Sequence, residues 1–116
     1  MNDQKEQYPR ELPIACKLTS EEQTRRWQEL ALELFSGCEG IEELEDGYRF
    51  VFPAGAYWAK KLVSFVVAER ECCPFFSFEI LFEPEGGPIS LVMRGPEGTK
   101  EFARQEFVNL ELFNEA

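Results

Sequence analysis

The amino-acid sequence predicts an α+β domain, in which a two-layer arrangement places helices on one face of an antiparallel sheet. Segments with apolar residues at helical spacing alternate along the chain with short segments whose apolar residues recur with a period of two. Their order begins as strand, helix, strand, strand, helix, strand. This is the order of a ferredoxin-like βαββαβ core, to which one more strand and one more helix are appended. The 116 residues suffice for one hydrophobic core and not for two.

The N-terminal part predicts a leader, a strand and a helix. Residues 1–11 are polar, and we expect them to form a leader, so that residues 12–116 make up the single domain. Residues 13–18 favour a first short strand, on which Ile14, Cys16 and Leu18 share one face by the period of two. Thr19 or Ser20 then provides a helix N-cap. The helix itself is indicated by apolar residues at i, i+3, i+4, i+7 and i+8, namely Trp27, Leu30, Ala31, Leu34 and Phe35.

A hairpin and a second helix follow. An Asp-Gly pair is the turn signal between strands predicted at residues 41–44 and 48–52. Residues 55–72 favour a helix, and Pro74 should end it, because proline disfavours helical geometry at the preceding residue.

The C-terminal part predicts a second hairpin and a last helix. Residues 76–83 alternate as a strand with one buried face, and residues 89–94 return as its partner after a Gly-Gly-Pro turn. Residues 99–113 then carry aromatic and leucine side chains at spacings that favour an amphipathic helix.

Composition argues against several classes of function. The net charge of −10 speaks against direct nucleic-acid binding, because affinity for phosphates depends on Lys and Arg. No stretch approaches the roughly 20 apolar residues of a membrane span, and the N-terminus lacks the apolar segment of a secretory signal. We therefore expect a cytoplasmic protein with reduced thiols. Because the chain has no histidine, a Ser-His-Asp or Cys-His arrangement is ruled out, and we expect no catalysed reaction.

The most informative motif is the cysteine doublet Cys72 and Cys73, directly before a proline. Ferredoxin-like wiring would bring Cys16, on the first strand, to the same edge of the sheet, and would leave Cys38 at the opposite edge. Glu69 lies one helical turn before the doublet and offers an oxygen ligand. Converging thiolates suit soft ions, so the predicted ligands Cys16, Cys72, Cys73 and Glu69 favour zinc, copper(I), cadmium, mercury(II) or arsenite.

Two other interpretations of the doublet remain open. Cysteines without a disulfide are often simply buried as small hydrophobic residues. The protein would then be a structural or interaction domain that forms a homodimer or binds a regulatory protein. Cys72 and Cys73 could also form a strained vicinal disulfide. The nearby carboxylates and the negative end of the helix dipole should raise the thiol pKa, which favours a metal site over a nucleophile.

Three segments resemble a small bacterial domain. They are residues 14–19 (IACKLT), residues 69–78 (ERECCPFFSF) and residues 94–98 (RGPEG), and the Cys-Cys-Pro-Phe-Phe run is the distinctive part. The domain occurs alone and also behind the helix-turn-helix part of mercury-responsive-type (MerR-like) transcription regulators. The resemblance implies a bacterial cytosolic protein that handles or senses a metal or metalloid. Cys16, Cys72 and Cys73 are the cysteine positions that this resemblance carries over, and Cys38 has no counterpart in it. The chain has no DNA-binding segment, which leaves effector binding or interaction with a partner.

Overall fold

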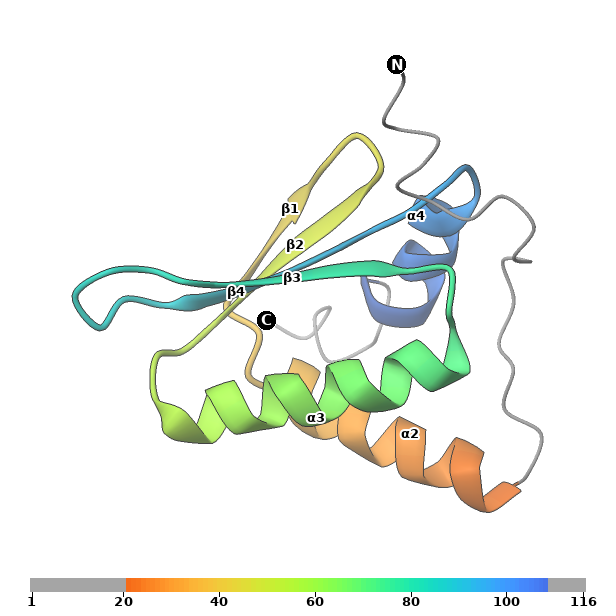
Figure 1. Ribbon diagram of the computed structural model, residues 1–116, viewed down its shortest axis with the longest axis horizontal. Helices are drawn as coiled ribbons and strands as arrows, with labels where there is room; N and C mark the ends of the chain where they lie inside the picture. The colour runs from red at the N-terminus through yellow and green to blue at the C-terminus, as the bar shows by residue number, and fades with distance from the viewer. Residues whose placement is uncertain (1–20, 109–116) are drawn as a thin grey trace.

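The computed structural model describes residues 21–108 and shows an α+β fold, as predicted (Figure 1). In chain order its elements are α2 (Glu21–Phe35), β1 (Gly40–Glu43), β2 (Gly47–Phe52), α3 (Ala56–Cys72), β3 (Ser77–Phe82), β4 (Ile89–Arg94), α4 (Thr99–Ala103) and the π-helical η1 (Arg104–Val108). The leader expected at residues 1–11 and the strand expected at residues 13–18 lie outside the described residues.

The described sheet consists of two hairpins joined side by side. Its four strands run in the order β1-β2-β4-β3, and all neighbours are antiparallel. A ferredoxin-like sheet would hold the first strand of the chain between β2 and β3, but β4 takes that place. The ferredoxin-like topology is therefore not confirmed. The burial of β4 explains its position, because every residue from Ile89 to Met93 is buried, as a central strand covered on both faces requires.

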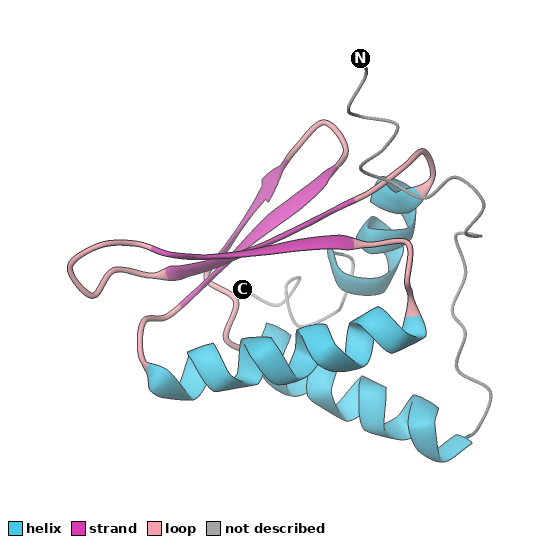
Figure 2. Cartoon of the chain, in the orientation of Figure 1, coloured by secondary structure: helices cyan, strands magenta, loops and turns pink. Residues whose placement is uncertain are grey.

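Helices α2 and α3 pack against each other on the same side of the sheet (Figures 1 and 2). Between them and the sheet lies an aromatic core centred on Phe35 of α2. The centroid of its ring lies 5.0 Å from that of Phe50, 5.3 Å from Phe65 and 5.1 Å from Phe107. These four residues are fully buried and come from α2, β2, α3 and η1. A strict two-layer arrangement, with all helices on one face, is not confirmed.

The end of α3 is the local structure that positions the cysteine doublet. The helix ends at Cys72, and the backbone N–H of Cys73 donates to the carbonyl oxygen of Glu69 at 2.7 Å. Pro74 follows, and Phe76 N–H then donates to the carbonyl oxygen of Cys73 at 3.3 Å, which closes a tight turn into β3. The predicted helix end before Pro74 is thus confirmed.

The last helix differs from the uniform α-helix expected over residues 99–113. It is α-helical over Thr99–Ala103 and π-helical over Arg104–Val108, and residues 109–113 lie outside the described range. Phe102 and Phe107 explain the change. Hydrogen bonds of the i→i+5 type bring residues five apart close to the same side of a helix. Phe102 can therefore pack edge-on against Phe75 while Phe107 packs into the core.

Neither α2, α3 nor any other helix within residues 21–108 combines the length and apolar character that crossing a membrane requires.

Candidate metal site at the end of α3

The structure brings together three of the four predicted ligands. Glu69, Cys72 and Cys73 each offer one ligand atom, and these atoms all lie within 4.8 Å of one another. A helix places residues three and four apart on one face, so the local fold alone aligns the carboxylate with both thiols. All three side chains are buried, with exposed fractions of 0, 1 and 0% respectively.

Neither of the other two cysteines is placed at the site by the described residues. Cys16 lies outside the described residues, so its predicted place beside the doublet stays a prediction. Cys38 is half-buried in the loop after α2, and its thiol donates to the carbonyl oxygen of Gly40 at 3.2 Å. Within residues 21–108, Cys38 belongs to no group of three or more ligands.

The doublet carries two thiols and no disulfide. The Sγ atoms of Cys72 and Cys73 are 3.4 Å apart, and the Cys73 thiol donates to the sulfur of Cys72. A disulfide would need a separation of about 2.05 Å. Two sulfurs this close present a pair of ligand atoms to the space beside Glu69.

Glu69 is a buried carboxylate with an incomplete set of partners. The indole N–H of Trp27, on α2, donates to its Oε1 atom. Its other oxygen, Oε2, is buried and accepts no hydrogen bond of ordinary geometry from the described residues. The Cys73 thiol nevertheless lies close enough to favour the ionised carboxylate. An orphaned carboxylate oxygen beside two thiols is the kind of atom that a bound cation would satisfy.

Burial dominates the electrostatics of Glu69. It raises the pKa of the carboxyl to about 7, against the hydrogen bond from Trp27 and the nearby Cys73 thiol, which lower it; the charge of Glu106 raises it further. Near neutral pH, Glu69 is therefore divided between its neutral and ionised forms.

Burial also raises the pKa of the Cys73 thiol, followed by the charge of Glu69 and the contact with Cys72. The direction expected from the sequence is confirmed, although burial outweighs the nearby charge as its cause. Without a cation, Cys73 is therefore a protonated and weak nucleophile. A bound cation reverses this, because it stabilises thiolates and carboxylates alike.

Sequence reasoning missed the role of Trp27. It was assigned to the apolar stripe of the first helix, and it does pack edge-on against Phe107, at 6.1 Å between ring centroids. Its indole N–H needs an acceptor when buried, and the nearest turn of α3 supplies Glu69. The sequence does place the carboxylate of Glu69 in a helix whose apolar residues are expected to be buried. It does not show that Trp27 is the partner of this carboxylate.

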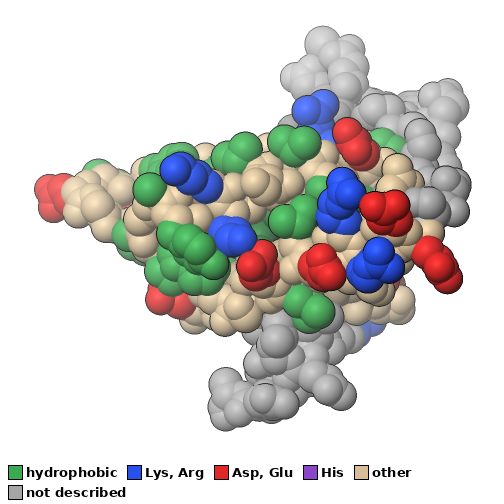
Figure 3. All heavy atoms as spheres, turned by 90° about the horizontal axis from the view of Figure 1, so that it is seen from below, with side chains coloured by type: hydrophobic (Ala, Val, Ile, Leu, Met, Phe, Trp, Pro, Cys, Tyr) green, Lys and Arg blue, Asp and Glu red, His purple; other side chains and the backbone are tan. Residues whose placement is uncertain are grey.

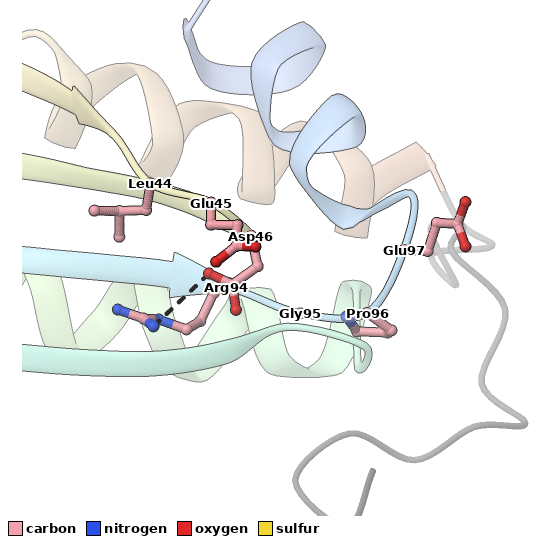
Figure 4. Close-up of a pocket in the computed structure, with 7 residues that line it drawn as sticks. All are labelled: Leu44, Glu45, Asp46, Arg94, Gly95, Pro96 and Glu97. Atoms are coloured by element: carbon pink, nitrogen blue, oxygen red, sulfur yellow. Dashed lines mark ion pairs between the residues drawn. The ribbon is translucent and has the colours of Figure 1, made fainter. Parts of the chain in front are cut away.

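A hollow whose lining holds no thiol lies at the end of the sheet where β3 begins (Figure 4). Its volume is about 770 Å³, and it lies between the β1–β2 turn and the loop after β4. Arg94 and Asp46 point toward each other there, with 3.7 Å between Nη1 and Oδ1. Arg94 also pairs with Glu79 on β3 at 3.8 Å, so its charge is already matched by carboxylates of the fold.

Comparison of the chain with protein-family models, with curated proteins and with solved structures gives no match.

Proposed function

We propose that this protein binds a soft metal ion or metalloid through Glu69, Cys72 and Cys73, with Cys16 as a third thiolate. The observation that carries the proposal is the orphaned Oε2 atom of Glu69 beside two adjacent thiols in a fully buried position. Packing alone does not explain a carboxylate at position 69, because burying a polar group without a partner is destabilising.

The donor set indicates the class of ion. Sulfur ligands select copper(I), zinc, cadmium, mercury(II) or trivalent arsenic over hard cations such as magnesium. Adjacent cysteines do not readily provide two corners of one tetrahedron, so additional ligands from elsewhere help. Binding would release the thiol protons, because the thiolate is the ligand.

The described part of the chain leaves Cys16 within reach of the doublet. Cys16 precedes Glu21 by five residues, which span at most about 17 Å. Along α2, Glu21 and Trp27 are about 9 Å apart, given a rise of 1.5 Å per residue. Trp27 in turn contacts Glu69, so the first turns of α2 already lie beside the site.

The biological role that we infer is sensing or accessory handling of the ion in a reducing cytoplasm. It rests on the resemblance to the domain found behind the DNA-binding part of MerR-like regulators. This chain would act as the effector-binding part alone, with a regulatory protein or a second copy as its partner.

The test is a titration of the reduced protein with zinc, cadmium, mercury(II) and arsenite, read by thiolate-to-metal absorption and native mass. We expect one ion per chain, lost in Cys72→Ser/Cys73→Ser and weakened in Glu69→Gln. Cys38→Ser is the matched control and should bind like the wild type. Cys16→Ser tests the third thiolate separately, by a loss of affinity with the stoichiometry retained.

One observation favours the second candidate, a structural or interaction domain. Both thiols of the doublet are as deeply buried as the core phenylalanines. If no ion binds, or if the double variant still binds it, the doublet is core. The exposed apolar residues of α3, which are Tyr57, Val63 and Val67, would then be the first surface to substitute, with the oligomeric state measured by sedimentation.

A further inference from the structure

The candidate site is closed to solvent, so an ion needs a route to it. Glu69, Cys72 and Cys73 are at most 1% exposed. Trp27 is half-buried, and its indole N–H bonds directly to Glu69. It therefore reaches from the surface to the buried carboxylate of the site.

Hollows lie on both sides of Trp27. The first, of about 330 Å³, separates α2 from η1 and is lined by Trp27, Gln28, Ala31, Leu32 and Glu106. The second, of about 230 Å³, lies between α2 and α3 and includes Trp27, Ala68 and Glu71. Over these helices the surface mixes hydrophobic, acidic and basic side chains (Figure 3). The indole thus has space to move aside on either flank, while the Phe35-centred core remains packed behind it.

Glu106 favours the first hollow as the route for a cation, because the second hollow includes the basic residue Arg26 as well as Glu71. This half-buried residue of η1 lines the hollow and is close enough for its charge to affect Glu69. The route then runs from one carboxylate, past the indole, to a second carboxylate and the two thiols. A cation is attracted along such a path, whereas an anion is repelled.

We propose that Trp27 is the gate of the buried Glu69–Cys72–Cys73 site and that the hollow between α2 and η1, with Glu106 in its wall, is the access route for the cation. This inference rests on the proposed function for the nature of the ion. The gate itself does not depend on metal binding, because it governs access to the thiols by any small molecule.

The first experiment measures access without metal. The native, reduced and chelator-treated protein is labelled with iodoacetamide, a small neutral reagent, and alkylation is read by mass on the peptide that contains Cys72 and Cys73. Trp27→Phe removes the indole N–H and should label about ten times faster, as expected for the loss of a hydrogen bond to a charged group. Trp58→Phe is the matched control, since Trp58 packs on Phe52. Equal labelling rates in Trp27→Phe and the wild type would overturn the gate.

The wild type provides a check that needs no variant. Opening of Trp27 exposes little surface, so the labelling rate should stay nearly constant at low urea. A rate that rises from the first additions of urea, in step with global unfolding, would mean that the thiols are reached only by unfolding and would overturn the proposal.

The second experiment tests the route with cadmium, by stopped-flow absorption of the thiolate–metal band. Glu106→Gln should slow cadmium association roughly threefold, as expected for one partly exposed charge, and leave iodoacetamide labelling unchanged. Glu29→Gln, an exposed carboxylate elsewhere on α2, is the control. An unchanged association rate in Glu106→Gln would overturn the route. If the wild type binds no cadmium at all, the proposed function fails, and the labelling experiment still decides the gate.

Discussion

Glu69 should make the protein less stable as the pH rises toward neutrality. Burial raises the pKa of its carboxyl from an ordinary 4.5 to about 7. In the unfolded chain the carboxyl ionises near its ordinary pKa, so between these two values the folded chain retains a proton that the unfolded chain has released. The stabilisation from Glu69 is therefore complete below pH 4.5 and is lost as the pH rises through 7.

The size of the effect follows from the two pKa values. They differ by about 2.5, and each pKa unit corresponds to 1.36 kcal/mol, so the free energy of unfolding should fall by about 3 kcal/mol between pH 4 and pH 8. The side chain is 0% exposed, so solvent does not screen this effect as it would at the surface.

Glu69→Gln isolates this contribution. The amide keeps the shape of the side chain and an acceptor oxygen for the Trp27 indole but carries no charge. We expect the difference in unfolding free energy between Glu69→Gln and the wild type to shift by about 3 kcal/mol in favour of the variant between pH 4 and pH 8. The measurement is urea denaturation of the reduced, metal-free protein. Glu71→Gln, an exposed neighbour, is the control, and parallel pH profiles for Glu69→Gln and the wild type would refute the reasoning.

Two further predictions concern the scaffold. Gly95→Ala should destabilise the protein by about 1–3 kcal/mol, because the added Cβ would lie 2.6 Å from the Oγ1 of Thr99. Gly40→Ala is the control and should cost less than about 1 kcal/mol, because its Cβ would meet no atom within 4 Å. Equal melting temperatures for the two variants would contradict this prediction. Phe35→Ala should cost about 3–5 kcal/mol in urea denaturation, since its ring packs against four other buried rings and would leave a cavity. Leu32→Ala, at a side chain 49% exposed, should cost far less.

Local sequence signals were sufficient for most elements. The apolar spacing of the first helix, the Asp-Gly turn and the proline after the doublet each act over a few residues, and the corresponding elements appear within a residue or two of their predicted bounds. The π-helical turn was missed, because Phe102 and Phe107 impose it only through the core that they reach together.

The ferredoxin-like strand order is the part of the predicted fold that the structure does not confirm, although the sequence holds one signal for the observed order. Residues 89–93 read Ile-Ser-Leu-Val-Met, a nearly continuous apolar run typical of a strand buried on both faces. Residues 77–82 include the polar Ser77 and the charged Glu79, as a strand at the border of the sheet can, and none of them is fully buried. The order of elements along the chain favours a known topology but carries no information about this contrast in burial.

The candidate site also has one part that local sequence predicts and one part that only tertiary packing determines. Glu69, Cys72 and Cys73 were predictable as a group, because helical spacing alone brings them together. Trp27 precedes Glu69 by 42 residues and meets it only through the packing of α2 on α3. Such a contact depends on tertiary structure, which no local pattern encodes.

The joining of two hairpins also bears on how an ion would reach the proposed site. Each hairpin closes locally, but Phe50 of β2 pairs with Leu91 of β4, and the chain between them includes the whole of α3. Closing so long a loop is entropically costly, so we expect this pairing to form late in folding. Until then we expect the thiols to be open to solvent. A newly made chain that meets a soft ion at this stage could enclose the ion as the sheet closes, without movement of the Trp27 indole. A folded chain without an ion would instead have to move the indole before an ion could enter.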